Sequence, residues 1–438
     1  MIHTSAKATS LVFTLFATGV LGGAWAGAAA MDRAQDPYGP LDTLVRVMSV
    51  IETAYVDEIS TSELVSAAID GMIARLDRHS DWLTAPEVAE LQADTRGEAT
   101  GIGVEFSSGA DGAVVTRVLP GSPAAREGIA PGDRIMEVDG AKVGQEVQAV
   151  EAALLGVRGD VARIKVMRTG WTEPATVEAT RDVVHVPSVE IGRIDGVLYA
   201  RVIQFQKGTG FELKTGLARE LAPSDAVILD LRDNPGGLLD EAVQIADLFL
   251  DEGTIVSTWG RLESERTTHP ATPGGLPADV PVWVLTNGWT ASAAEIVAGA
   301  LQDTRRATVV GTRTYGKGSV QTVFQHRDGS ALKLTIGKYY TPSGTPVADR
   351  EGRRPDVEVP WPVSSSPRSK LEARLAALDS PAEREELLAL LAKIPDDTPT
   401  RRPPIPWDEP IVDRPGHDPQ LAAALALAAR ADRKPAAP

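Results

Sequence analysis

The sequence predicts an α/β protein of two or three domains, and three successive patterns along its 438 residues support this prediction. Residues 41–95 carry apolar side chains at helical spacing, residues 99–181 contain short strands separated by glycine turns, and residues 183–360 alternate strands with helices. The last pattern is typical of a buried sheet covered by helices. With 43% hydrophobic residues, most of the chain can fold around ordinary cores.

Composition excludes several classes of function. The net charge of -16 argues against a nucleic-acid partner, because such binding depends on lysine and arginine contacts to phosphate. The absence of cysteine removes disulfides, thiolate metal sites and cysteine catalysis. Six histidines are present, but none shows metal-ligand spacing or a Ser-His-Asp pattern. We therefore expect neither a metal nor a cofactor.

The N-terminal 1–30 segment indicates export to the periplasm or cell envelope. Residues 11–30 carry no charge and follow Lys7, and a helix of this length could span a bilayer. Two small-residue patterns, Ala24-Trp25-Ala26 and Ala28-Ala29-Ala30, resemble signal-peptidase sites. A cleaved signal peptide and a retained inner-membrane anchor both fit this segment.

The helical pattern at 41–95 contains two sequences of the capping-box type, Ser60 with Glu63 and Thr84 with Glu87. Such boxes mark the first turn of a helix. We expect this segment to serve packing or assembly, without chemistry of its own.

The glycine-rich segment at 99–181 opens with Gly101-Ile102-Gly103-Val104 and continues through short strands, a helix and a closing strand. One Gly-x-Gly alone is more simply an ordinary turn, but the whole ordered set resembles a PDZ domain. In that family this loop offers backbone N–H groups to the terminal carboxylate of a peptide, which pairs as an added strand. The resemblance implies peptide binding at these four residues.

The alternating region predicts a series of short strands and helices, followed by a proline- and charge-rich extension at 361–438. Helical pieces are expected in the extension near 371–391 and 420–429, again without chemistry. Within the alternating region, strands are expected at 197–204, 226–231, 282–286, 307–311 and 333–338, and helices at 211–221, 238–250 and 292–301.

Ser292 lies where an apolar strand turns into an alanine-rich helix. Asn287-Gly288 forms a turn signal just after the strand, and Ser292 then opens the helix. A helix start offers free backbone N–H groups and a field that favours negative charge. Taken alone, however, a serine at this position is more simply a helix cap.

Lys317 lies between two glycines, four residues before Gln321. Alone, such a lysine is usually an exposed turn residue. The segment 311–318 nearly matches a phosphate-binding loop, but Gly318 stands where the hydroxyl residue for magnesium should be. The residues after it alternate like a strand, whereas a phosphate loop opens a helix. These two departures argue against an NTPase.

A third candidate element is the loop Asp230-Leu231-Arg232-Asp233-Asn234-Pro235-Gly236-Gly237, which follows an apolar strand. Backbone N–H groups in a loop of this kind can stabilise an oxyanion if they are fixed where the charge develops. A plain strand-to-helix turn fits the same residues.

Together these elements resemble the carboxyl-terminal processing peptidases, which are serine endopeptidases with a Ser–Lys dyad and an inserted PDZ domain. The resemblance covers about 41–360 and implies a crotonase-like α/β peptidase core at 183–360. The intervals from Ser292 to Lys317 and from Lys317 to Gln321 are those of the family. The resemblance implies that Ser292 is the nucleophile, Lys317 the general base and Gln321 the residue that orients the lysine.

The resemblance also implies an oxyanion site made by Gly236 or Gly237 together with the N–H of Ala293. One departure from the family is visible, since Ala294 replaces a second serine. Because the family's nucleophile is the first serine, we expect this substitution to be tolerated.

The expected function is cleavage of proteins near their C-termini, with apolar C-terminal peptides as ligands of the PDZ domain. The family resemblance is compatible with an adaptor protein and with a homo-oligomer. The main alternative is a non-catalytic PDZ scaffold of the cell envelope that binds protein C-termini. An acyl-CoA enzyme is a more remote alternative, against which export and the PDZ domain both argue.

Overall fold

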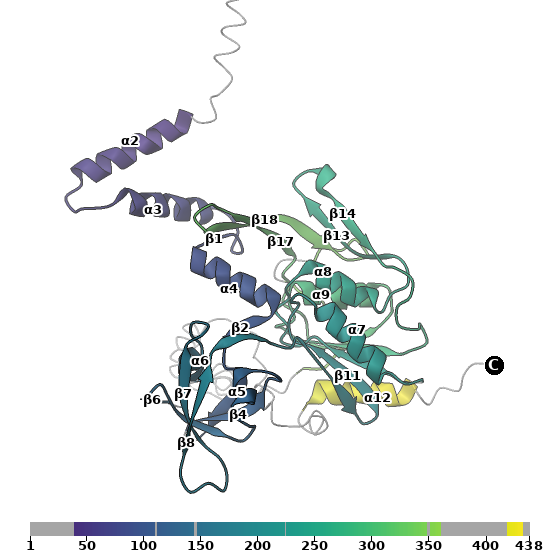
Figure 1. Ribbon diagram of the computed structural model, residues 1–438. Coiled ribbons are helices and arrows are strands. Elements are labelled where there is room, and N and C mark those ends of the chain that lie inside the picture. The colour runs from purple at the N-terminus through teal and green to yellow at the C-terminus, as the bar shows by residue number, and fades with distance from the viewer. Residues whose placement is uncertain are drawn as a thin grey trace, which may run out of the picture. The chain divides into compact units, whose positions relative to one another are not determined.

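The computed structural model describes residues 39–109, 112–143, 147–223, 225–347, 351–360 and 418–431 (Figure 1). The chain divides into two units, Met1–Arg78 and His79–Pro438. The expected signal or anchor segment at 1–30 and the expected helix at 371–391 lie outside the described residues. Among the helices that are described, none combines the length and the apolar character needed to cross a membrane.

The first unit contains two helices, α2 (Gly39–Ala54) and α3 (Thr61–Ile73). The predicted capping box is present at the start of α3: Ser60 Oγ accepts from Glu63 N–H at 3.2 Å, and the Glu63 carboxylate accepts from Ser60 N–H at 2.8 Å. Neither helix has a buried residue.

The second unit begins with a strand that the sequence analysis missed, because it took 41–95 as helical throughout. This strand, β1 (Asp81–Leu83), pairs antiparallel with β18 (Ala331–Tyr340), and α4 (Ala85–Arg96) follows it. Three residues are too few to show strand periodicity, and the pairing partner lies far away in the sequence. The expected helix start at Thr84 is present, since Thr84 N–H donates to the Glu87 carboxylate at 2.7 Å.

The glycine-rich segment folds into a sheet with strand order β3-β4-β5-β7-β8, which leaves β3 as an edge strand. Its core includes Ile102, Val115, Ile135 and Ile164, all at most 1% exposed. The short strands β2 (Glu98–Gly101) and β9 (Asp182–His185) pair where the chain enters and leaves the domain. The remaining elements are β3 (Val104–Gly109), β4 (Gly112–Val118), α5 (Pro123–Arg126), β5 (Arg134–Val138), β6 (Ala141–Lys142), α6 (Val147–Leu154), β7 (Val161–Met167) and β8 (Ala175–Thr180).

The core of the second unit is a sheet in the order β10-β11-β12-β15-β16-β19, in which only the β10–β11 pair is antiparallel. The crossovers contain three helices, as the alternating pattern predicted. The elements are β10 (Val189–Ile194), β11 (Val197–Val202), α7 (Thr209–Glu220), β12 (Val227–Asp230), α8 (Leu239–Asp247), β15 (Val282–Thr286), α9 (Ala293–Asp303), β16 (Thr308–Gly311) and β19 (Val357–Glu358).

Alternate residues of these strands pack on opposite faces of the sheet. Val284 belongs to the core cluster with α7, α8 and α9, whereas Trp283 and Leu285 belong to a second cluster that includes α12 (Pro419–Ala431). A parallel sheet needs cover on both faces, and α12 supplies it on the second (Figure 1). The predicted helix at 420–429 is therefore confirmed, and it is a structural layer of the core.

A second, antiparallel sheet joins β1 and β18 to β13 (Thr254–Gly260), β14 (Thr267–Pro270) and β17 (Ser319–Gln325). The sequence analysis did not predict β13 and β14, whose partly polar sequences lack a clear apolar run. It did predict the strand that follows Lys317, and β17 confirms it. A strand at this position is incompatible with a phosphate-binding loop, which would open a helix.

The candidate segments meet because three parallel strands end at the same edge of the core sheet. In register, Asp230 of β12 lies opposite Leu285 of β15, and Thr286 of β15 lies opposite Gly311 of β16. The loops that follow these strands carry the two glycines, the serine and the lysine. The carboxyl ends of parallel strands are the usual place for a functional site in an α/β sheet.

We expect Leu421→Ala to lower the free energy of unfolding by about 2–5 kcal/mol, because Leu421 is fully buried between α12 and the sheet. Denaturant titration followed by tryptophan fluorescence measures this, since Trp283 lies in the same cluster. The exposed Ala422→Gln on the same helix should change stability by less than about 0.5 kcal/mol. Equal stabilities of the two variants would contradict the role given to α12.

Candidate active site

Ser292 is held in a backbone conformation that few residues adopt. It immediately precedes α9 with φ 54° and ψ −116°. Its N–H donates to the Glu295 carboxylate at 2.9 Å, and its carbonyl accepts from the N–H groups of Glu295 and Ile296. A positive φ at a residue other than glycine costs about 1–3 kcal/mol, and such strain is concentrated at functional sites. The serine therefore occupies a strained turn that the surrounding hydrogen bonds hold in place.

The Glu295 carboxylate is fully buried and accepts four hydrogen bonds. Its Oε1 accepts from Thr314 Oγ1 at 2.5 Å and from Gly316 N–H at 2.7 Å. Its Oε2 accepts from Lys317 N–H at 2.8 Å and from Ser292 N–H at 2.9 Å. Four donors match the acceptor capacity of one ionised carboxylate.

This carboxylate brings the serine and the lysine together. Ser292 and Lys317 share one oxygen atom as acceptor, so their backbone nitrogens lie within about 6 Å of each other. Ser292 belongs to the loop 287–292 after β15, here called the serine loop, and Lys317 belongs to the loop 312–318 after β16, here called the lysine loop. Glu295 is thus the link that fixes the serine loop relative to the lysine loop.

Two opposing effects act on the pKa of Glu295. Burial raises it above the ordinary value of 4.5, while the hydrogen bonds from Thr314, Lys317, Gly316 and Ser292 work to lower it. The raised direction means that burial is the larger effect. A proton on either oxygen would displace one of the four donors, so only the ionised form can hold both loops.

Gln321 lies on β17 and is oriented by hydroxyl groups. Its amide nitrogen donates to Ser319 Oγ at 2.8 Å and to Thr335 Oγ1 at 3.2 Å. With both amide hydrogens used in this way, its carbonyl oxygen is the atom that could accept from a lysine. The half-buried Lys317 lies between the buried Gly316 and Gly318 at the start of the same segment.

The backbone of the loop after β12 is in contact with Ser292. A Cβ atom placed on Gly236, which has φ 101°, would lie 2.7 Å from Ser292 Cβ, so only glycine fits here. The N–H of Gly236 donates to Asn234 Oδ1 at 2.8 Å. Of the three N–H groups expected at an oxyanion site, those of Gly237 and Ala293 have no hydrogen-bond acceptor among the described residues.

Hydrogen bonds also fix the glycine loop to the serine loop. Ala291 N–H donates to Asn234 O at 2.9 Å, and Thr290 Oγ1 donates to Leu231 O at 2.8 Å. Asn287 adds a further link through Asp233. The glycine loop, the serine loop and the lysine loop thus form one connected network.

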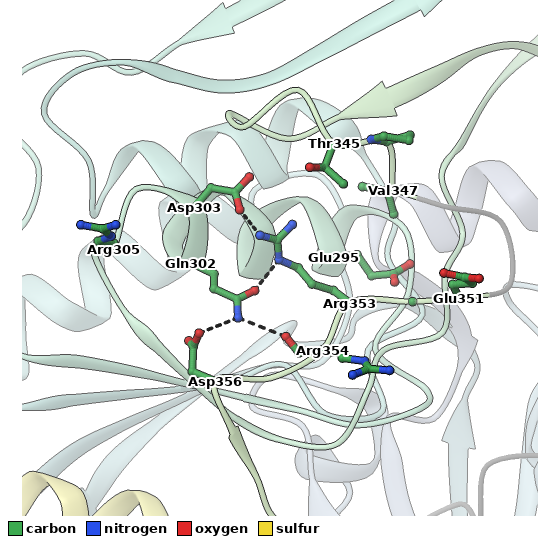
Figure 2. A pocket seen from close by; sticks show the side chains of 12 residues that line it. Glu295, Gln302, Asp303, Arg305, Thr345, Val347, Glu351, Arg353, Arg354 and Asp356 are labelled. Atoms are coloured by element: carbon green, nitrogen blue, oxygen red, sulfur yellow. Dashed lines mark hydrogen bonds and ion pairs between the residues drawn. The ribbon is translucent and has the colours of Figure 1, made fainter.

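A cavity of about 610 Å³ lies beside α9, and Glu295 is among its lining residues (Figure 2). Arg353 forms an ion pair with Asp303 and a hydrogen bond with Gln302 in this cavity. The backbone of Arg353 also pairs with Thr314, one of the four donors to Glu295. These contacts brace the lysine loop from the side of the cavity.

The PDZ-like domain has a groove of about 310 Å³ along its edge strand β3. The carbonyls of Ile102 and Gly103 accept from Ala124 and Leu119 N–H groups, so the N–H groups that follow them point the other way. A Cβ on Gly103, at φ 76°, would lie 2.4 Å from Ser122 Cβ, so glycine is required there. The groove is lined by Ala99, Gly101, Ile102, Gly103, Val104, Glu105, Phe106, Leu119, Glu151, Leu154, Leu155, Val184 and Val186.

Known families match two parts of the chain. The model of peptidase family S41 matches residues 196–359, and a PDZ domain model matches residues 100–179. A relative from Bartonella bacilliformis named "Carboxy-terminal-processing protease" is 37% identical over 336 residues, which are 75% of this chain and 77% of that protein. The chain belongs to peptidase family S41. It is a serine peptidase with a PDZ domain, as the resemblance predicted.

Two further comparisons gave similar proteins. A "Probable CtpA-like serine protease" from Staphylococcus saprophyticus is 34% identical and aligns with 73% of this chain and 66% of the relative. The solved structure of a photosystem II D1 C-terminal processing protease is 27% identical, with a TM-score of 0.43, and covers 77% of this chain and 97% of that protein.

The sequence analysis of this S41 peptidase missed Glu295, although a signal for it was present. Ser292 and Glu295 have the same Ser-x-x-Glu spacing that predicted the capping box at Ser60 and Glu63. Applied here, that rule finds the bond from Ser292 N–H to Glu295. The contacts to Gly316 and Lys317 are tertiary, and no local pattern contains them.

We expect Glu295→Gln to reduce kcat/KM by at least about a hundredfold and to lower the free energy of unfolding by about 2–4 kcal/mol. The amide nitrogen would face two N–H donors in place of an acceptor. Steady-state kinetics and denaturant titration test this against Glu252→Gln, an exposed control that should behave as the wild type. Activity and stability equal to the control would contradict the role of Glu295.

The raised pKa of Glu295 predicts a pH-dependent stability. The folded state holds the proton of this group more tightly than the unfolded chain, whose value is near 4.5. The part of the stability that is linked to this proton is therefore fully present below pH 4.5 and is lost as the pH rises through the folded-state pKa, while the hydrogen bonds of the ionised carboxylate remain. We expect the unfolding free energy of the wild type, relative to Glu295→Gln, to decline over that window in denaturant titrations. A rise of this relative free energy with pH would show that the hydrogen bonds affect the pKa of Glu295 more than burial does.

Proposed function

We propose that this S41 peptidase binds the C-termini of proteins in its PDZ groove and cleaves the same chains nearby, with Ser292 as nucleophile and Lys317 as general base. The observation that carries the proposal is the shared Glu295 carboxylate, which holds both residues at the carboxyl edge of the core sheet. The name of the Bartonella relative supports cleavage near C-termini.

In the proposed reaction, neutral Lys317 Nζ accepts the proton of Ser292 Oγ while Oγ forms a bond to the substrate carbonyl carbon. The carbonyl oxygen becomes an oxyanion, which the N–H groups of Gly237 and Ala293 stabilise. The C–N bond then breaks, and the leaving amine takes the proton from Lys317. Water then attacks the acyl-enzyme while the same lysine takes its proton, the bond between the carbonyl carbon and Ser292 Oγ breaks, and Lys317 returns the proton to Oγ. Gln321 orients the lysine through its carbonyl oxygen.

Gly236 has a different role in this proposal from the one expected. Its N–H is occupied by Asn234, which leaves Gly237 as the oxyanion donor of this loop. Gly236 instead lets the loop approach Ser292 without a side chain between them. In this proposal the side chain of Asn234 fixes the orientation of the loop.

The PDZ groove supplies the substrate in this proposal. Because β3 is an edge strand, an extended C-terminal peptide can pair with it while its carboxylate meets the N–H groups of the loop 101–104. Ile102, Leu154 and Leu155 favour an apolar terminal side chain. We further propose export to the periplasm or cell envelope through residues 1–30, on the basis of their sequence.

We expect Lys317→Arg to fold normally and to cleave an unfolded substrate protein at a rate indistinguishable from Ser292→Ala. Arginine keeps the positive charge but cannot act as a base near neutral pH. Gel-based cleavage assays and circular dichroism measure rate and folding. Wild-type turnover by Lys317→Arg would refute the dyad, and equal turnover by Ser292→Ala and the wild type would favour the non-catalytic PDZ scaffold.

We expect Leu155→Glu to lower kcat/KM about tenfold for a protein substrate with an apolar C-terminus, through a higher KM. The matched control is Val157→Glu, which adds the same charge at an exposed residue outside the groove. Amidation of the substrate's C-terminus should reproduce the loss in the wild type. If neither change alters KM, the PDZ groove does not select C-termini.

A further inference from the structure

The loop that carries Gly236 and Gly237 has a fully buried arginine at its base. Arg232 is 1% exposed and lies two residues after the end of β12. On one side its guanidinium is paired with Asp230, with Nη2 to Oδ2 at 2.6 Å and Nε to Oδ1 at 2.9 Å. On the other side, Nη1 donates to Asp418 Oδ1 at 2.8 Å and to Gln420 Oε1 at 3.2 Å. The loop is thus connected to the C-terminal helix α12.

Asp418 connects two elements through one oxygen atom. Its Oδ1 accepts from Arg232 Nη1 and also from the N–H of Leu421 at 2.9 Å, in the first turn of α12. Gln420 donates to Val359 O at 2.9 Å and so adds a contact beyond β19. The first turn of α12 therefore surrounds the end of the Arg232 side chain.

Carboxylates on two sides stabilise the buried charge of Arg232. Burial alone would lower the pKa of Arg232, but Asp230 and Asp418 hold it well above the ordinary value, so the guanidinium stays charged. Tyr199 donates its hydroxyl to Asp230 at 2.7 Å. Loss of Asp418 would leave one end of a buried cation with Gln420 as its remaining partner, which is a costly arrangement.

A displacement of Arg232 would move the backbone of the loop whose glycines contact Ser292. Asn234, two residues further on, donates to Val202 O and accepts from Gly236 N–H. The loop is short, and its glycine backbone is in close contact with Ser292. A displacement of about 1 Å at a reacting centre can cost a hundredfold in rate.

We propose that Asp418 is a positioning residue for the oxyanion loop, so that docking of the C-terminal helix α12 sets the catalytic rate. The proposal rests on the proposed function, because it assumes that Gly237 stabilises the oxyanion. The C-terminal helix acts from the face of the sheet opposite α9, without touching substrate. In this proposal the first turn of α12 affects the rate through Arg232, while the rest of the helix serves packing.

The test compares Asp418→Ala and Asp418→Asn with the wild type on a peptide substrate. We expect Asp418→Ala to lower kcat by about ten- to a hundredfold with KM changed less than twofold, because positioning affects the transition state and not substrate binding. Asp418→Asn keeps an acceptor oxygen for Arg232 and Leu421, so it should fold and lose kcat by a smaller factor, again at constant KM. Arg430→Ala, exposed on the same helix, is the control and should match the wild type.

Wild-type kcat in both Asp418 variants, or losses that appear in KM and not in kcat, would overturn the proposal. If Asp418→Ala fails to fold, the kcat of Asp418→Asn decides by the same criterion. Ser292→Ala is measured in parallel. Residual wild-type activity in Ser292→Ala would refute the proposed function itself, whereas an inactive Ser292→Ala beside full activity in every Asp418 variant that folds would refute the role of Asp418 alone.

Discussion

The site depends on one buried carboxylate that joins two loops. Glu295 projects from the first turn of α9 and accepts hydrogen bonds from the backbones of Ser292, Gly316 and Lys317 and from the Thr314 hydroxyl. In a low-dielectric interior such a network stabilises strongly only when every member is satisfied. The strained backbone of Ser292 and the placement of Lys317 therefore have a common physical cause. Neither residue could hold its position through local structure alone.

The sheet explains why these loops meet at all. Parallel strands β12, β15 and β16 end at one edge and send out the glycine loop, the serine loop and the lysine loop. Both faces of the sheet must be covered, so α7, α8 and α9 lie on one side and α12 on the other. The helix α12 is connected to the site through Arg232, which is bonded to Asp418 at the start of that helix. The packing of α12 is thereby linked to the loop that is proposed to bind the oxyanion.

Sequence patterns predicted the features that depend on neighbouring residues. The apolar strand before Ser292, the helix after it and the strand after Lys317 all show local periodicity, and the structure contains them. Most of what the patterns missed depends on distant residues. The bonds from Gly316 and Lys317 to Glu295 and the pairing of β1 with β18 are contacts that no local window contains. The bond from Gly236 N–H to Asn234 is different, because it spans two residues and its outcome depends on the turn that the backbone adopts there. The helix near 420–429 was found, but its place against the sheet was not, because an alanine-rich amphipathic segment does not indicate its partner.

Amide hydrogen exchange in the wild type and in Glu295→Gln tests the central claim most directly, because the claim is that one carboxylate protects amides in two separate loops. Mass spectrometry of peptides covering 287–296 and 312–318 reports on these amides, with the strand at 227–230 as an internal control. We predict that both loop peptides exchange at least about tenfold faster in the variant, at exchange times over which the core strand stays protected in both proteins. Wild-type protection of either loop peptide in Glu295→Gln would contradict the account.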